Sequence, residues 1–150
     1  MFLGEGLGEA VANEGSLKMK ELTYLHCQCF NIMNISNGFL NFVKAKKGVP
    51  CIFIVLQDNK QQTLKVMKRL LEANIKIYSV IISDCTDEDD MQFFEKFSGD
   101  TKQIFYIKRS GQALSALLCI IPLQRLAYDT TIALGYDPDR PRNLAKELTT

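Results

Sequence analysis

The chain has 150 residues, about the size of one domain, and a domain of this size can bury a substantial hydrophobic core. Hydrophobic residues make up 47% and charged residues 23%, which is ordinary for a soluble globular domain. The net charge of +1 argues against binding to nucleic acid or to an anionic membrane surface. The longest apolar stretch, Ala113–Leu123, is too short to cross a bilayer, and the first residues lack the basic start of a signal peptide.

The N-terminal part of the sequence predicts a short strand followed by a long helix. Met1–Leu3 has the character of a strand end, and Glu9 to about Cys29 has the side-chain spacing of a helix. The glycines between them, Gly4, Gly6 and Gly8, do not follow the GxGxxG spacing of a phosphate-binding loop, so we interpret them as a tight turn. Because the chain begins inside a strand, we expect the sheet to have lost an upstream neighbour.

The middle of the chain alternates helices and strands. The β-branched and aromatic run Cys51–Leu56 is typical of a parallel strand that is buried on both faces. The other predicted elements are a short helix at Phe39–Val43 behind a loop, a helix at Gln61–Ala73, a strand at Ile75–Ile82, the acidic run Asp84–Asp90 leading into a helix at Met91–Phe97, and a strand at Gln103–Ile107. This alternation implies an α/β fold, a three-layer sandwich around a mainly parallel, flavodoxin-like sheet.

A long helix and a tail complete the chain. Gln112–Leu134 has a helical pattern, and Pro122 inside it predicts a kink or a break. Gly135 suits the position just after a helix end. The last residues, Tyr136–Thr150, have no periodicity. We therefore expect one domain over residues 1–135 and a C-terminal tail over residues 136–150.

The chain contains five cysteines, an odd number without a CxxC pair. We therefore expect reduced thiols in a cytoplasmic protein, with no metal site and no cofactor. The five are Cys27, Cys29, Cys51, Cys85 and Cys119.

Two segments have much more specific patterns. The first, Glu14–His26, reads EGSLKMKELTYLH, and the second begins at Ile121 and ends with PRNLAK at Pro141–Lys146. Together they resemble the second sugar-isomerase (SIS) lobe and C-terminal tail of the glutamine–fructose-6-phosphate aminotransferase (glucosamine-6-phosphate synthase) family. The resemblance extends over essentially all 150 residues and is strongest at the two ends. It implies a SIS-type fold and an isomerising transfer of ammonia to fructose 6-phosphate, which gives glucosamine 6-phosphate for UDP-N-acetylglucosamine synthesis.

The resemblance also implies roles for three residues. Glu21 matches the carboxylate that moves a proton between the first two carbons of the sugar, a task that needs one carboxylate within reach of both carbons. Lys146 matches the lysine that forms a Schiff base with the opened ketose, and Ala145 matches a substrate-binding backbone position beside it. Without the resemblance, Glu21 would be interpreted as a solvated helix carboxylate and Lys146 as a lysine in a frayed tail.

The sequence departs from the family pattern at the position that opens the sugar ring. Where the family carries Glu-x-Lys-His-Gly-Pro, this chain reads Asn34–Phe39, and Asn37 stands in place of the histidine. An amide cannot exchange a proton near neutral pH, whereas an imidazole can. The one histidine of the chain, His26, belongs to the helix motif and is not an obvious substitute.

The family further implies a glutaminase domain and a first SIS lobe whose serine- and threonine-rich loops hold the sugar phosphate, and these 150 residues contain neither. We therefore expect a homodimer, or a chain that supplies the missing lobe. Two hypotheses remain open. The chain is either part of an active aminotransferase, or an inactive paralogue or fragment that acts as a carbohydrate-derivative-binding or interaction module. An unrelated α/β module, such as a receiver-like domain, is disfavoured by the PRNLAK tail.

Overall fold

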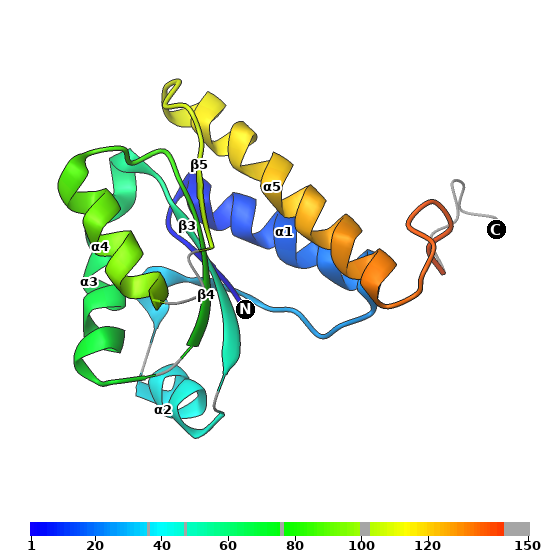
Figure 1. Cartoon of the computed structure of the whole chain (residues 1–150), viewed down its shortest axis with the longest axis horizontal. Helices are drawn as coiled ribbons and strands as arrows, with labels where there is room; N and C mark the ends of the chain where they lie inside the picture. The colour runs from blue at the N-terminus through cyan, green and yellow to red at the C-terminus, as the bar shows by residue number, and fades with distance from the viewer. Residues whose placement is uncertain (36, 47, 76, 100–102, 143–150) are drawn as a thin grey trace.

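The computed structural model describes residues 1–35, 37–46, 48–75, 77–99 and 103–142, and these residues form one sheet with helices on both faces. The five strands are all parallel, in the order β2-β1-β3-β4-β5 (Figure 1). The strands are β1 (Phe2–Gly4), β2 (Cys29–Asn31), β3 (Val49–Val55), β4 (Ile77–Ser83) and β5 (Ile104–Tyr106). The predicted α/β sandwich around a parallel sheet is therefore confirmed.

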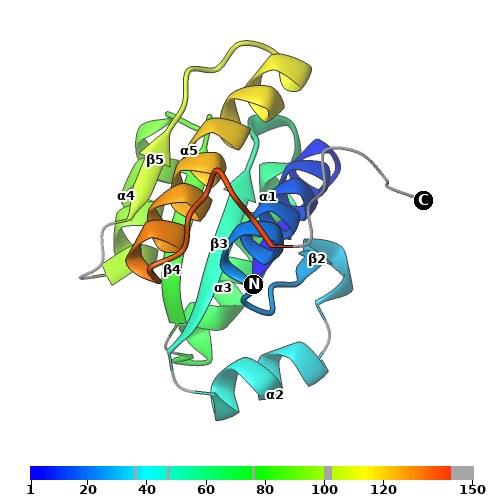
Figure 2. The same cartoon turned by 90° about the vertical axis from the view of Figure 1, so that its right-hand side faces the viewer.

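The helices form the two outer layers. Helices α1 and α5 lie side by side on one face of the sheet, while α3 and α4 cover the other face and α2 lies near its lower end (Figures 1 and 2). The helices are α1 (Leu7–Thr23), α2 (Asn37–Ala45), α3 (Lys60–Glu72), α4 (Glu88–Ser98) and α5 (Gln112–Ala133), with 3-10 turns η1 (Ile32–Asn34) and η2 (Gln57–Asn59). Among the described residues, none of these helices combines the length and the apolar character needed to cross a bilayer.

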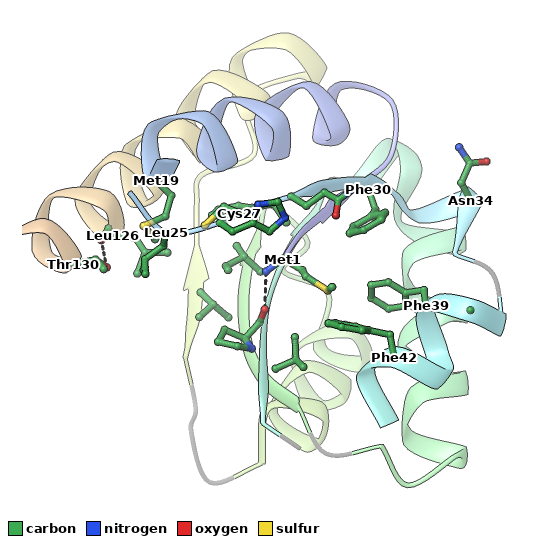
Figure 3. A pocket seen from close by; sticks show the side chains of 18 residues that line it. Met1, Met19, Leu25, Cys27, Phe30, Asn34, Phe39, Phe42, Leu126 and Thr130 are labelled. Atoms are coloured by element: carbon green, nitrogen blue, oxygen red, sulfur yellow. Dashed lines mark hydrogen bonds between the residues drawn. The ribbon is translucent and has the colours of Figure 1, made fainter. Parts of the chain in front are cut away.

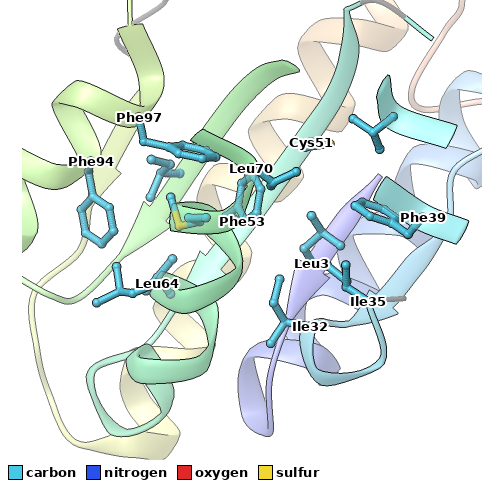
Figure 4. Close-up of a cluster of buried hydrophobic side chains, with 14 of the residues drawn as sticks. Leu3, Ile32, Ile35, Phe39, Cys51, Phe53, Leu64, Leu70, Phe94 and Phe97 are labelled. Carbon is cyan, nitrogen blue, oxygen red and sulfur yellow. The ribbon is translucent and has the colours of Figure 1, made fainter. Parts of the chain in front are cut away.

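The sheet separates two hydrophobic cores because its central strand is buried on both faces. On β3, Phe53 points into the core with α3 and α4, where its ring meets Phe97 edge-to-face at 5.3 Å between centroids (Figure 4). The neighbouring residue Ile54 points into the other core with α1 and α5. Alternation along the strand thus supplies both layers, as the continuous apolar run predicts.

The predicted helix Glu9–Cys29 is wrong at its C-terminal end. Helix α1 ends at Thr23 because Tyr24 takes a left-handed conformation with φ 59° and its N–H donates to the Lys20 carbonyl. The chain then returns to the sheet as β2, an edge strand that the sequence analysis missed. Leu22 and His26 are four residues apart, which is typical of a continuing helix. The left-handed conformation of Tyr24 ends the helix between them, so the local spacing does not decide the structure here.

The two features expected in the long C-terminal helix have different outcomes. Helix α5 runs through Pro122 without a break. Gly135, with φ 77°, follows its end as expected: its N–H donates to the Ile132 carbonyl and the Tyr136 N–H donates to the Thr131 carbonyl. These two bonds form a Schellman motif, which directs the chain away from α5 at Tyr136.

The glycine-rich segment after β1 makes a close turn. A Cβ built on Gly4 would lie 2.2 Å from the Gly8 carbonyl oxygen, so the turn requires a residue without a side chain there. Gly6, with φ 56°, stands at the start of α1. In the sheet, β1 pairs with β2 on one side and with β3 on the other, and the expected loss of an upstream neighbour stays a prediction.

Candidate functional site

Glu21 lies in the last turn of α1, where the ends of α1 and α5 approach the C-terminal segment of the chain (Figure 1). Its carboxylate is partly buried, with 23% of the side chain exposed, and Lys18 donates to Oε2 at 2.8 Å. The hydrogen bond from Lys18 to Glu21 raises the pKa of that lysine. Lys18 also lies 3.7 Å from Glu14, so it sits between two carboxylates on one face of the helix. The Glu21 carboxylate is therefore held by Lys18 at the end of the helix.

The segment after α5 comes back to the end of α1. The backbone N–H of Arg142 donates to the hydroxyl of Tyr24 at 2.6 Å, across 118 residues of sequence. Tyr24 stands three residues after Glu21 and takes the left-handed conformation that ends α1. The root of the C-terminal tail thus contacts the residue that ends α1, three positions after Glu21.

Three of the predicted site positions fall wholly or partly outside the described part of the chain. Ala145 and Lys146 lie outside the described residues, so their assignment stays a prediction. The backbone of Asn37 begins α2, and the assignment of its side chain also stays a prediction. Among the predicted catalytic residues, Glu21 alone has a described environment.

An apolar cavity of about 940 Å³ lies near Glu21 but does not include it. Its walls come mostly from the start of β1 and β3, the end of α1 and the segment around α2. Phe39 and Phe42 point into it from α2, while Asn34 stands at its rim (Figure 3). Gly38, the residue after Asn37, also lines it, as does His26. A sugar phosphate needs several polar partners, so this cavity is a poor candidate for its binding site.

The candidate site lies at an unusual edge of the sheet. In parallel α/β sheets, ligands usually bind at the carboxyl ends of the strands. Helix α1 connects two parallel strands and so runs back against them, which places Glu21 and the tail root at the amino ends of the strands instead. A substrate here would need further walls from outside the sheet.

Sequence reasoning missed the residues that hold the tail at this place. Tyr24 belongs to the first specific segment and Arg142 to the second, yet no periodicity links residues so far apart. The sequence gives one indication of their importance: each residue lies within one of the two segments that have the most specific patterns. No group of three or more His, Cys, Asp or Glu among the described residues is arranged to hold a metal ion.

The chain is similar to known proteins over nearly its whole length. No protein-family model matches the sequence. The chain is 32% identical over 148 residues to the glutamine–fructose-6-phosphate aminotransferase (isomerizing) of Fusobacterium nucleatum, and 33% identical over 149 residues to that of Xanthomonas campestris. In each case the match covers 99% of this chain and 23% of the relative. This chain has the SIS-type fold and is similar over nearly its whole length to about a quarter of each of these aminotransferases.

This chain is also similar to a solved structure of a related aminotransferase. The C-terminal domain of glucosamine-fructose-6-phosphate aminotransferase from Francisella tularensis superposes with a TM-score of 0.67 at 25% identity. The superposition covers 93% of this chain and 36% of that domain. The SIS lobe described here thus corresponds to rather more than a third of the solved domain, and to about a quarter of the full-length relatives.

Proposed function

We propose that this SIS lobe is the sugar-isomerase part of an aminotransferase that converts fructose 6-phosphate into glucosamine 6-phosphate for amino-sugar biosynthesis. Glu21 moves the proton between the first two carbons of the sugar, and Lys146 holds the opened ketose as a Schiff base. The backbone at Ala145 contacts the bound sugar. A cytoplasmic location suits the free thiols of all five cysteines.

The observation that carries this proposal is the contact between Tyr24 and Arg142. Lys146 is the fourth residue after Arg142, so a fully extended chain would span at most about 14 Å between them. Tyr24 stands three residues after Glu21, directly after the end of α1. Two segments from opposite ends of the sequence, both matching the aminotransferase pattern, therefore come within reach of one substrate.

The residue types suit the chemistry. The carboxylate of Glu21 can accept a proton from one sugar carbon and return it to the next, since a carboxylate has two oxygens on a short flexible stem. The amine of Lys146 would attack the ketone carbon and lose water to give an iminium, which activates the neighbouring carbon–hydrogen bond. Lys18 donates to Glu21 at 2.8 Å and so helps to fix the position of this carboxylate.

Binding of the sugar phosphate requires loops of another SIS lobe, which these 150 residues do not contain. A second SIS lobe, from a partner chain, from a longer form of this polypeptide or from a second copy, would provide the missing binding loops. The exposed side of α5 offers a surface for that lobe, because Leu117 and Ile121 are 61% and 60% exposed on it.

The alternative function is a catalytically inactive module that binds a carbohydrate derivative or a partner. The observation that favours it is Asn37, which replaces the ring-opening histidine of the related family. This alternative predicts binding of fructose 6-phosphate without turnover, and no gain of turnover in Asn37→His.

Borohydride trapping tests the assignment of Lys146. The full-length protein, assembled with its second lobe, is mixed with fructose 6-phosphate and sodium borohydride, which delivers hydride to the iminium carbon and fixes the sugar as a stable amine. Peptide mass spectrometry should place the reduced sugar phosphate on Lys146, and Lys146→Arg should remove it. An adduct on Lys18 or Lys20 instead, or on no lysine, would refute the assignment.

Deuterium exchange tests Glu21 separately. In deuterated water, the wild-type protein should incorporate deuterium at the first carbon of the sugar, and Glu21→Gln should slow this exchange by at least about a hundredfold, the usual contribution of a general base. Trapping on Lys146 should persist in Glu21→Gln. Undiminished exchange in this variant would assign the proton transfer to another group.

A further inference from the structure

Two tyrosines and an arginine hold the root of the tail against α1. The guanidinium carbon of Arg142 lies 5.3 Å from the ring centroid of Tyr24 and 5.3 Å from that of Tyr136. The two rings meet edge-to-face at 5.1 Å. The backbone N–H of Arg142 donates to the Tyr24 hydroxyl at 2.6 Å, so the arginine is engaged by both its side chain and its backbone.

Both rings are placed by helix ends. Tyr24 caps α1 and adopts φ 59°, a left-handed conformation that is unusual for a bulky residue. A strained residue of this kind persists when its surroundings determine it from several directions. Tyr136 is held by the Schellman motif that ends α5, through its N–H bond to Thr131 at 3.0 Å. The side-by-side packing of α1 and α5 then fixes the two rings relative to each other (Figure 2).

We propose that Tyr24, Tyr136 and Arg142 form a clamp that fixes the start of the C-terminal tail and thereby positions Lys146 for reaction near Glu21. The clamp as a structural device stands on the contacts above, whereas its purpose rests on the proposed function of Lys146. These three are positioning residues: they act through the tail and not on the sugar.

Tryptic cleavage after Arg142 measures the clamp directly. Trypsin does not cut Arg140–Pro141, because of the proline, so the Arg142–Asn143 bond reports the release of the tail root. Tyr24→Phe keeps the ring and removes the hydroxyl that accepts from Arg142. It should speed this cleavage about fivefold, the equivalent of one ordinary hydrogen bond. Tyr136→Leu should do so by a similar factor, because one of the two rings is lost.

The matched control is Tyr78→Phe, since Tyr78 is 60% exposed on β4, on a different element. Its cleavage rate after Arg142 should equal that of the wild type. Circular dichroism on all variants checks that they remain folded. Cleavage within twofold of the wild type in both Tyr24→Phe and Tyr136→Leu would overturn the clamp.

Trapping with fructose 6-phosphate and borohydride separates the clamp from the proposed function. In the assembled protein, Tyr24→Phe should lower the rate of trapping on Lys146 by about the same factor as it raises cleavage, while Glu21→Gln should leave cleavage unchanged. Faster cleavage with undiminished trapping would overturn the positioning role. An absence of trapping in the wild type would overturn that role together with the proposed function, and the cleavage rates would still decide whether the clamp exists.

Discussion

Gly15 of α1 faces Leu123 of α5 so closely that a Cβ on Gly15 would lie 2.8 Å from Cδ1 of Leu123. The same Cβ would come within 3.0 Å of the ring of Phe2. Leu123 and Phe2 are 2% and 1% exposed, so neither can easily move aside. The missing side chain therefore sets how closely the two helices approach each other and the sheet.

Gly15→Ala should therefore destabilise the protein. Overpacking costs about 1–3 kcal/mol, and the better helix propensity of alanine returns about 1 kcal/mol of that. We expect a net loss of about 1 kcal/mol in the free energy of unfolding, measured by urea titration. Asn13→Ala, at an exposed position of the same helix, is the control and should change stability by less than about 0.5 kcal/mol. A more stable Gly15→Ala protein would contradict this account of the α1–α5 contact.

The central strands could be predicted from sequence because their patterns are local. The runs at Cys51–Leu56 and Ile75–Ile82 match β3 and β4 within two residues, since both strands are buried and rich in β-branched residues. Strand β2 could not be predicted in the same way. It has three residues, all only partly buried, and it lies at an edge of the sheet.

The candidate site divides in the same manner. Glu21 can be found from the sequence because it lies within the segment Glu14–His26, whose residues follow the family pattern. The contact of Tyr24 with Arg142 depends on where two helices end and how they pack, which no short-range spacing encodes. The ion pair between Arg125 and Asp129, at 2.6 Å, is the reverse case, because a spacing of four residues on an exposed helix face is enough to encode it.

The cysteines should react at very different rates. Burial raises the pKa of Cys51 and of Cys85 to about 11, and that of Cys119 to about 12. Each pKa unit above the working pH lowers the thiolate fraction about tenfold. Cys27 and Cys29 are half-buried, and burial raises the pKa of each to a smaller extent.

With iodoacetamide at pH 8, Cys27 and Cys29 of the folded protein should be alkylated first, and the three buried thiols at least about a hundredfold more slowly. Peptide mass spectrometry over time gives the rate at each site. In concentrated guanidinium chloride all five should react at comparable rates, which serves as the control. Alkylation of Cys119 in the native protein as fast as that of Cys27 would show that its surroundings open readily.

Lys60 ties α3 to the start of α4. Its amine lies 3.0 Å from Oδ2 of Asp87 and 2.5 Å from Oδ2 of Asp90, and 15% of its side chain is exposed. The hydrogen bond with Asp90 raises the pKa of Lys60, and the bond from Lys60 lowers the pKa of Asp87 below its usual 3.8. A carboxyl group whose pKa is lower in the folded than in the unfolded protein stabilises the fold at a pH above its unfolded-state pKa. This stabilisation is lost as the pH falls through its folded-state pKa. A raised lysine pKa adds stability below its usual 10.5.

Lys60→Met should therefore cost about 1 kcal/mol or more at pH 7, as expected for a charge-assisted hydrogen bond. The difference from the wild type should stay level between pH 5 and 8 and shrink as the pH falls below about 4. Urea titrations across this range measure it. Lys65→Met, at an exposed position of the same helix, is the control and should show a small, pH-independent effect. A difference that grows on acidification would be inconsistent with the assigned ion pairs.

The outer face of α5 should mediate self-association when no other lobe covers it. Large apolar side chains recur on that face at a spacing of three, four or seven residues, the pattern of a helix that packs against a partner. They are Leu114, Leu117, Ile121, Tyr128 and Ile132, each 48–61% exposed. Single exposed apolar residues are common on protein surfaces, whereas a continuous stripe along a 22-residue helix is typical of an interaction surface.

Sedimentation of the isolated 150-residue chain should therefore give a species heavier than its 17.0 kDa monomer. Leu117→Lys and Ile121→Lys should each shift it toward the monomer by about tenfold or more in dissociation constant, because a buried charge replaces an apolar contact. Gln92→Lys, on the exposed side of α4, is the matched control and should leave association unchanged. A wild-type chain that stays monomeric at concentrations near 100 μM would assign this face to a different lobe, and the dimer of this chain would be excluded.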